Sequence, residues 1–427
     1  MRKRAVLLLI AFLTSFMLSA CVVRQFGIAQ AITPVSGIIS SNTTWTQANS
    51  PYNLTGNVLV DKGVTLTIEA RATVNLNSYY IRVNGTLTAK GNPTNKITFN
   101  GGQITFTTAS NGWNEQTQSG CIIQNAIINH MTISNSNPIK IDNSIINGGI
   151  SVASSSIISN SIVAGNIGSL MSTISDNNVK GDITVGSVTL GGFTTAEESS
   201  TVSGNIVEGS VISGSPNGTP QIFNNTVSRG GITCTGYGSI FNNYVHSCGT
   251  GISLNSVRVF GGYLACFATI ENNVVVDNTN GITIYLASLD GPGTLVPTVQ
   301  NNTIAGNSIG ISVDEMNYGA TPIIRYNNLQ NNSNYNFYLA APNNVDVSNN
   351  WWGTTNEAAI NQSIYDFKND FNLGKVTFVP FLTEPNPHAG SIPEFPSWII
   401  LLSIMIGTLA TAVCFKRRKR NQYLPLQ

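Results

Sequence analysis

Along the middle of the chain, paired asparagines recur in a fixed relation to the apolar positions around them. The pairs recur at 224/225, 242/243, 272/273, 301/302, 327/328 and 349/350, and most have an apolar side chain two positions before and two positions after. Nine residues after the first asparagine of four pairs, a short alternating segment opens: GISL at 251, GITI at 281, GISV at 310 and NFYL at 336. Strict alternation of this kind predicts short β-strands.

Upstream, the same unit continues in a weaker form, as NAII at 125, NSII at 143, NSIV at 160, NNV at 177 and GNIV at 204. A repeat with such short strands cannot bury its own apolar side chains, so it needs a copy of itself above and below. We therefore expect stacked coils of parallel strands over residues 120–352. The expected inward column is Ile252, Ile282, Ile311 and Phe337, and the expected outward column is Ser253, Thr283, Ser312 and Tyr338.

The second asparagine of each pair is predicted to lie at a bend of its coil. An asparagine there tolerates left-handed backbone dihedrals, and its amide can hydrogen-bond the equivalent amide of the next coil. The predicted asparagine ladder consists of Asn225, Asn243, Asn273, Asn302, Asn328 and Asn350.

The constant spacing between asparagine pair and strand favours this solenoid over a sandwich of antiparallel strands, which the composition alone would allow. Residues 50–383 resemble the right-handed parallel β-helix family, including carbohydrate-binding and sugar-hydrolase repeat proteins and the copper-binding factor of nitrous oxide reductase maturation. The resemblance implies an all-β, right-handed parallel β-helix. It is far less informative about activity.

Both ends of the predicted solenoid need covers, because open ends expose unpaired strand edges. Residues 32–119 are expected to form an N-terminal cap and the first, wider coils. Residues 353–383 are expected to form a C-terminal cap, in which a helix begins at a capping box, Thr354 to Glu357, and a strand follows. One face of that helix would carry Ile360, Ile364, Phe367 and Phe371.

The termini have the composition of targeting segments. Residues 1–31 are typical of an export signal, cut either after Ala31 or before Cys21, which would then be lipidated. Residues 384–396 are proline-rich and predict a stalk, residues 397–415 are uncharged and predict a transmembrane helix, and the basic tail 416–427 is expected to stay cytoplasmic. The segment Ile392 to Pro396 is similar to the Pro-Glu-Phe sorting signals of archaeal surface proteins. These features predict a cell-surface protein held by one membrane span.

Charge and sequons agree with an outward-facing chain. Outside the terminal basic clusters, 12 basic side chains face 20 acidic ones, so a nucleic acid partner is not expected. Candidate N-glycosylation sites are Asn42, Asn53, Asn84, Asn217, Asn224, Asn301, Asn331 and Asn361.

Candidate chemistry is sparse. Carbohydrate-active β-helices need carboxylates on an outward strand column, and this chain offers only Asp314, with Glu315 beside it. Tyr285, Asp314 and Tyr338 are expected on neighbouring coils, where rings and a carboxylate suit a sugar ligand. His130, His246 and His388 lie far apart, so no metal site and no cofactor is predicted.

These observations favour a non-enzymatic surface protein with a structural, adhesive or glycan-binding role, whose partners are the membrane and polysaccharides or cell-surface glycans. The alternative is an extracellular polysaccharide lyase, glycoside hydrolase or epimerase with the same fold.

Overall fold

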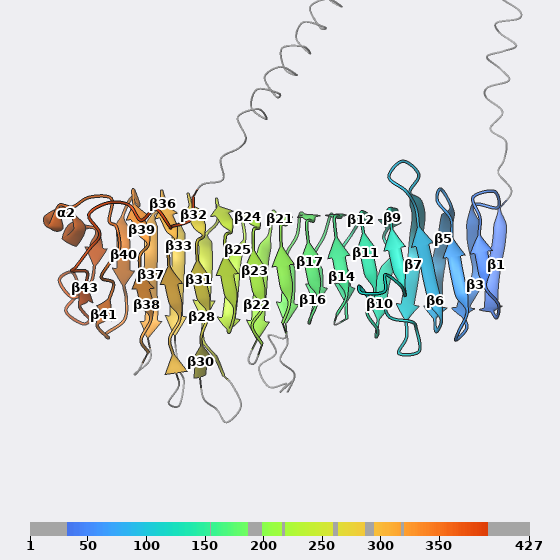
Figure 1. Ribbon diagram of the computed structural model, residues 1–427, viewed down its shortest axis with the longest axis horizontal. Helices are drawn as coiled ribbons and strands as arrows, with labels where there is room; N and C mark the ends of the chain where they lie inside the picture. Colours follow the sequence, from blue (N-terminus) through green and yellow to red (C-terminus); the bar gives the residue numbers. More distant parts are fainter. Residues whose placement is uncertain are drawn as a thin grey trace, which may run out of the picture. The chain divides into compact units, whose positions relative to one another are not determined.

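The computed structural model describes residues 32–153, 155–186, 199–215, 218–258, 264–286, 294–316 and 320–391. The chain divides into two compact units, Met1–Gly165 and Asn166–Gln427. Each unit consists of short parallel strands that recur once per coil and pair with the equivalent strands of neighbouring coils, as Figure 1 shows. Parallel pairing between successive coils is the predicted solenoid, so this part of the fold prediction is confirmed.

In unit 1, two parallel sheets form the coil walls. The first sheet contains, in spatial order, β1 (Thr33–Ile39), β3 (Tyr52–Val60), β5 (Thr73–Val83), β7 (Ile97–Phe106), β9 (Ala126–Asn129), β12 (Ile145–Asn147) and β15 (Ile162–Val163). The second contains β2 (Thr43–Trp45), β4 (Thr65–Ile68), β6 (Thr86–Lys90), β8 (Ile122–Gln124), β11 (Lys140–Asp142) and β14 (Ile157–Ser159). Strand β10 (Thr132–Asn135) pairs with the second half of β7, and β13 (Ile150–Val152) lies beside β10.

In unit 2, three parallel sheets form the walls. Sheet one contains β18 (Asn178–Val179), β21 (Ile206–Val207), β24 (Thr226–Ser228), β27 (Tyr244–His246), β32 (Val274–Val276), β36 (Thr303–Ala305) and β39 (Asn328–Gln330). Sheet two contains β17 (Thr173–Ser175), β20 (Thr201–Ser203), β23 (Gln221–Phe223), β26 (Ser239–Phe241), β31 (Thr269–Glu271), β35 (Thr298–Gln300) and β38 (Ile323–Arg325). Sheet three contains β16 (Ile167–Ser169), β19 (Ile183–Gly186), β22 (Ser210–Ser215), β25 (Gly231–Gly236), β28 (Thr250–Asn255), β33 (Asn280–Leu286), β37 (Ile309–Met316), β40 (Tyr335–Leu339) and β42 (Ile364–Tyr365).

Two smaller sheets complete unit 2. They are formed by β29 (Val257–Arg258), β30 (Leu264–Cys266) and β34 (Thr294–Leu295), and by β41 (Val345–Asp346) and β43 (Val376–Thr377).

The core of each unit is a set of columns in which side chains of the same position stack from coil to coil. In sheet three, the register aligns the predicted residues Ile252, Ile282, Ile311 and Phe337, and all four are buried. The equivalent column of unit 1 contains Tyr52, Val74, Phe99, Ile128, Ile146 and Val163. Each apolar side chain is thus covered by its neighbours above and below, so a single coil is not expected to fold alone.

Buried asparagines link the coils of unit 2 at one bend. From Asn205 onward, each side-chain Oδ1 accepts hydrogen bonds from the backbone N–H and the Nδ2 of the asparagine one coil earlier, at 2.8–3.0 Å. The asparagine ladder runs through Asn177, Asn205, Asn225, Asn243, Asn273, Asn302, Asn327 and Asn350.

Two details of the predicted ladder are corrected. The left-handed dihedral belongs to the first asparagine of a pair, as in Asn272 with a φ of 56°, and the ladder residue follows it. In the sequence Tyr326-Asn327-Asn328, Tyr326 takes the left-handed conformation with a φ of 60°, so Asn327 and not Asn328 enters the ladder. The ladder asparagine lies two residues before a buried strand residue, which here is Leu329. If Asn328 occupied the ladder instead, the strand would shift by one residue and the Leu329 side chain would turn outward.

A second, shorter ladder follows at the next bend, which the sequence reasoning did not find. Asn278 donates from its N–H and Nδ2 to Asn307 Oδ1, and Asn307 donates in the same way to Asn332 Oδ1, all at 3.0 Å. Asn278 and Asn307 are single asparagines in the sequence, and only Asn332 belongs to a pair, Asn331-Asn332, so this ladder has no regular paired signal.

The C-terminal cap differs from its prediction. Helix α2 covers only Glu357–Gln362, and its N-cap is Asn356, whose side chain accepts from the Ala359 N–H. Ile364 lies in strand β42, and Phe371 is 79% exposed, so the expected apolar helix face does not form. Pairing of β42 with β40 satisfies the backbone better than a further helical turn, since it adds one more strand to sheet three.

Residues 384–391 do not project as a stalk. They return along the bend that holds the asparagine ladder: the Asn386 N–H donates to Asn328 Oδ1 at 2.8 Å, and the Gly390 N–H donates to the Asn301 carbonyl at 2.9 Å. Asn386 Nδ2 also donates to Asn301 Oδ1 at 3.0 Å. This segment therefore ties several coils of unit 2 together.

The predicted transmembrane helix, residues 397–415, lies outside the described residues, as do the signal segment 1–31, residues 392–396 and the tail 416–427. In the part of the chain that the structure describes, no helix has the length and apolar character needed to cross a bilayer. The predicted fold class is corrected accordingly to an all-β solenoid of parallel sheets.

Candidate functional site

The candidate site lies on the outer face of sheet three, near the C-terminal end of unit 2. The register aligns Thr283, Ser312, Tyr338 and Tyr365 in one column, in which Thr283, Tyr338 and Tyr365 are half-buried and Ser312, predicted to point outward, is buried. Tyr285 follows two residues after Thr283, and Asp314 two residues after Ser312, so both point to the same side of the sheet as that column. The structure thus brings the three predicted residues Tyr285, Asp314 and Tyr338 onto one face.

A β-bulge places two carboxylates side by side on this face. Ile284 is level with Val313, but Tyr285 is level with Glu315, so Asp314 is an extra residue in β37. Val313 and Met316 are buried, whereas Asp314 and Glu315 are both exposed. A bulge commonly redirects a side chain in this way. Simple alternation would have turned Glu315 inward, which is why its position could not be read from the sequence.

Tyr285 and Glu315 form a polar pair. The Tyr285 hydroxyl donates a hydrogen bond to the Glu315 carboxylate, and this bond, reinforced by the negative charge, raises the pKa of Tyr285. The Tyr285 ring is 43% exposed. The pair therefore presents an exposed aromatic ring beside a carboxylate acceptor.

Replacing Glu315 by glutamine is expected to lower the pKa of Tyr285 toward the ordinary tyrosine value, because the neutral amide no longer disfavours the phenolate. The measurement is an NMR pH titration of ring-labelled tyrosine, with Tyr285→Phe assigning the signal. Asp314→Gln is the matched control and should change this pKa less. An unchanged titration in Glu315→Gln would show that the two side chains do not interact.

Three further rings form a tyrosine cluster, defined as Tyr335, Tyr338 and Tyr365. Tyr338 and Tyr365 are stacked, with ring centroids 4.6 Å apart and an interplanar angle of 15°. Tyr335 meets Tyr365 edge-on at 5.3 Å and lies 5.9 Å from Tyr338. Partial burial, together with the charges of Tyr365 and Asp314, raises the pKa of Tyr338. The Tyr338 hydroxyl therefore stays protonated at neutral pH and can act as a donor.

Sequence reasoning missed Tyr335 and Tyr365. Tyr335 precedes the NFYL segment and Tyr365 lies in the region expected to be a helix. The signal that was available is the Ile364-Tyr365 dipeptide, which repeats the buried–outward pattern of Phe337-Tyr338.

The candidate glycosylation sites differ in accessibility. Asn42, Asn224, Asn331 and Asn361 are exposed, Asn53, Asn84 and Asn301 are half-buried, and Asn217 lies outside the described residues. Asn301 Nδ2, the atom that would carry a glycan, donates to Glu271 Oε1 at 3.0 Å. Modification at Asn301 would have to break this bond and the contact with Asn386.

Among the described residues, no group of three or more histidine, cysteine, aspartate or glutamate side chains is arranged to hold a metal ion. The cysteines of this part of the chain, Cys121, Cys234, Cys248 and Cys266, are buried and reduced. Burial raises the pKa of Cys234 to about 12 and that of each of the other three to about 11.

These four thiols are expected to resist alkylation in the folded protein, because a buried thiol with a raised pKa supplies very little thiolate at pH 8. Incubation with iodoacetamide followed by peptide mapping checks this. Labelling should appear at all four only after denaturation. Rapid native labelling of Cys234 would contradict its place in the core.

Comparison with known proteins adds no relative: no family model, no curated protein and no solved structure matches this chain. Fold and site together define a parallel β-helix solenoid that carries an aromatic and acidic surface on one sheet. The resemblance to carbohydrate-binding and sugar-hydrolase repeats stays a prediction.

Proposed function

We propose that this chain is an exported, non-enzymatic protein of the right-handed parallel β-helix type, which binds neutral glycans at the cell surface through sheet three of unit 2. The observation that carries the proposal is the tyrosine cluster beside two exposed carboxylates. Sugar rings pack their apolar C–H faces on aromatic rings, and carboxylates accept hydrogen bonds from sugar hydroxyls.

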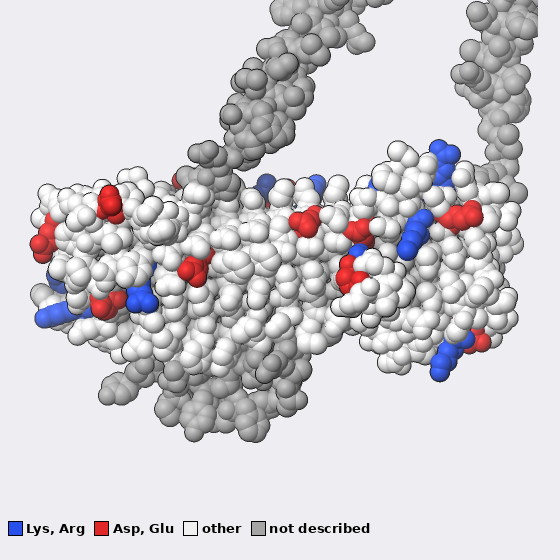
Figure 2. Space-filling model, in the orientation of Figure 1, with Lys and Arg blue, Asp and Glu red and all other residues white. Residues whose placement is uncertain are grey.

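The charge on this face favours a neutral ligand. Asp314 and Glu315 are exposed, and neither takes part in an ion pair among the described residues. Two unpaired negative charges would repel an acidic sugar. Charged side chains are few on the faces of the two units that Figure 2 shows.

The direct test is binding of a panel of neutral and acidic glycans to Tyr338→Ala and Tyr365→Ala, measured by array and by calorimetry. Each substitution is expected to weaken neutral glycan binding about fivefold or more, since stacking on an aromatic ring is worth about 1 kcal/mol or more and the paired ring loses its orientation. Tyr80→Ala is the matched control, because Tyr80 is an exposed tyrosine of unit 1.

Two results would refute glycan binding by this face: no neutral glycan bound by the unaltered protein, or equal binding by Tyr338→Ala and the unaltered protein. Circular dichroism should confirm that each variant keeps its strands.

The bulge favours one second candidate, a polysaccharide lyase, glycoside hydrolase or epimerase that uses Asp314 and Glu315. Sugar hydrolysis requires a pair of carboxylates, and the bulge exposes two. This function requires turnover of a glycan that Asp314→Asn and Glu315→Gln both abolish. If the protein binds a glycan and does not turn it over, the result rules out the enzyme candidate for that glycan and supports the non-enzymatic proposal.

A further inference from the structure

A groove of about 570 Å³ lies on the outer side of the second sheet of unit 1. Its floor is formed by outward side chains of β4, β6 and β8. The register aligns Thr65 with Thr86 and Thr88 with Ile122, so the floor consists of three threonine side chains and one apolar residue. This volume is within the usual range of ligand pockets.

The loop between β7 and β8 forms the wall of this groove, and several bonds hold it in place. Asn111 Nδ2 donates to Thr86 Oγ1 at 2.7 Å, and the Trp113 N–H donates to the Pro138 carbonyl at 2.8 Å. The Trp113 indole donates to Glu115 Oε2 at 2.6 Å. Lys140 Nζ lies 3.1 Å from Glu115 Oε1 and 5.1 Å from the Trp113 ring centroid. A wall fixed at so many points is preorganised for a ligand.

The charge of Glu115 is therefore neutralised within the wall. The Trp113 hydrogen bond, with the adjacent Lys140, lowers the pKa of Glu115, so the carboxylate stays ionised and paired. It lies outside the groove lining and does not oppose an anionic ligand there.

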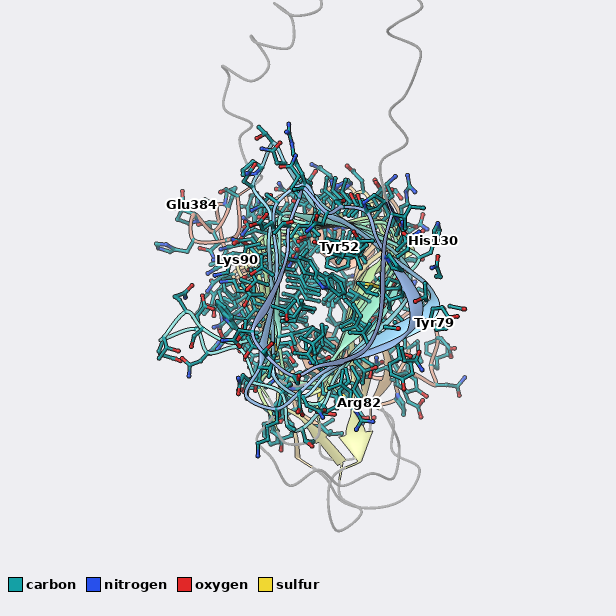
Figure 3. The ribbon with its side chains drawn as sticks, turned by 90° about the vertical axis from the view of Figure 1, so that its right-hand side faces the viewer. Tyr52, Tyr79, Arg82, Lys90, His130 and Glu384 are labelled. Atoms are coloured by element: carbon teal, nitrogen blue, oxygen red, sulfur yellow. The ribbon has the colours of Figure 1, made fainter. Side chains whose placement is uncertain are left out.

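Lys90 supplies a positive charge at the end of β6. It lines the groove and is exposed, and no carboxylate of the described residues lies within ion-pair distance of it. Figure 3, which looks along the coil, places Lys90 on its outer side and Tyr52 within it. Gln118 and Ser119 add an amide and a hydroxyl to the same lining.

We propose that this groove binds an acidic saccharide. The ammonium group of Lys90 would pair with a sugar carboxylate or sulfate, and the hydroxyl and amide groups of Thr86, Thr88, Gln118 and Ser119 would hydrogen-bond the sugar hydroxyls. The site lies in unit 1, carries the opposite charge to the tyrosine face, and does not depend on the function proposed for that face.

A saccharide fits better than a peptide for two reasons. The backbone groups of β4, β6 and β8 are already paired with neighbouring coils, so no free strand edge can accept a peptide backbone. The apolar lining residues Trp113 and Ile122 are 7% and 4% exposed, which leaves little surface to bury a peptide side chain. Side-chain hydroxyls and amides match sugar hydroxyls instead.

The test is calorimetry of the full chain with tetragalacturonate, its methyl ester, and a tetraglutamate peptide as probes. Tetragalacturonate is expected to bind with an affinity that falls as salt rises, and Lys90→Glu is expected to weaken it at least tenfold. Lys90→Arg should retain binding, because the charge is kept. Lys62→Glu, a change at an exposed turn of the same unit, and Tyr338→Ala should both leave the affinity unchanged.

Three outcomes would overturn the proposal. The first is no binding of tetragalacturonate at millimolar concentration, and the second is equal binding by Lys90→Glu and the unaltered protein. The third is an affinity for tetraglutamate equal to that for tetragalacturonate, which would show that the groove binds a peptide, or any anion, without recognising the sugar. Stronger binding of the methyl ester than of the free acid would also exclude a role for the Lys90 charge.

Discussion

Replacing Asn273 by alanine is expected to lower the free energy of unfolding by about 3–5 kcal/mol. Asn273 is fully buried, and its Nδ2 donates to the Ile240 and Glu271 carbonyls and to Asn302 Oδ1. Its Oδ1 accepts from both the N–H and the Nδ2 of Asn243. Alanine removes all of these bonds and leaves buried backbone groups of two coils without partners.

Urea denaturation followed by circular dichroism measures this loss. The control is Asn272→Gly, in the same pair: Asn272 has a left-handed φ of 56°, which glycine adopts freely, and its substitution should cost less than about 1 kcal/mol. Equal stability of Asn273→Ala and the unaltered protein would show that the ladder does not support the coils.

Replacing Phe337 by alanine is expected to cost a similar amount, about 3–5 kcal/mol, through loss of buried area and the cavity left behind. Phe337 is fully buried and stacks between Ile311 and Ile364 in the core column of sheet three. Because it precedes Tyr338, the substitution should also weaken any ligand bound by the tyrosine cluster.

Phe371→Ala is the matched control, since Phe371 is 79% exposed and its loss should change stability by less than about 0.5 kcal/mol. Thermal and urea unfolding of both variants provide the comparison. A smaller effect of Phe337→Ala than of Phe371→Ala would place the core elsewhere.

The repeating parts of the fold could be predicted because one rule applies to every coil. Ile252, Ile282 and Ile311 occur at the same distance from an asparagine pair, and this periodicity fixes both the inward column and the parallel register. The ladder position was predictable for the same reason wherever the pair was intact. At Tyr326 the rule failed, because a tyrosine took the left-handed position usually given to asparagine.

The parts without a repeat could not be predicted from local pattern. The bulge at Asp314 depends on how β33 and β37 align, and the short helix α2 ends because Ile364 pairs with Phe337 of another coil. The return of Asn386 to Asn301 and Asn328 joins residues 58 to 85 positions apart. Such contacts are set by tertiary packing, which the spacing of residues along the chain does not reveal.

For the candidate site, the sequence indicated the correct face of the sheet but only part of its chemistry. The positions of Tyr285, Asp314 and Tyr338 could be predicted because inward and outward side chains alternate along each strand. Glu315 as the partner of Tyr285, and Tyr365 as the partner of Tyr338, required the coordinates.

The most direct test of the account is a set of distances along one outward column of unit 2. Spin labels at Gln221 and at Thr269, Thr298 or Ile323 are two, three and four coils apart in sheet two. Cys21 and Cys414 are replaced by serine so that only the introduced sites carry labels. Electron paramagnetic resonance should then give distances between the two labels that grow by about 4.8 Å per coil, to roughly 19 Å between the Cα atoms of Gln221 and Ile323. Distances that do not increase regularly from Thr269 to Ile323 would contradict the stacking of parallel coils.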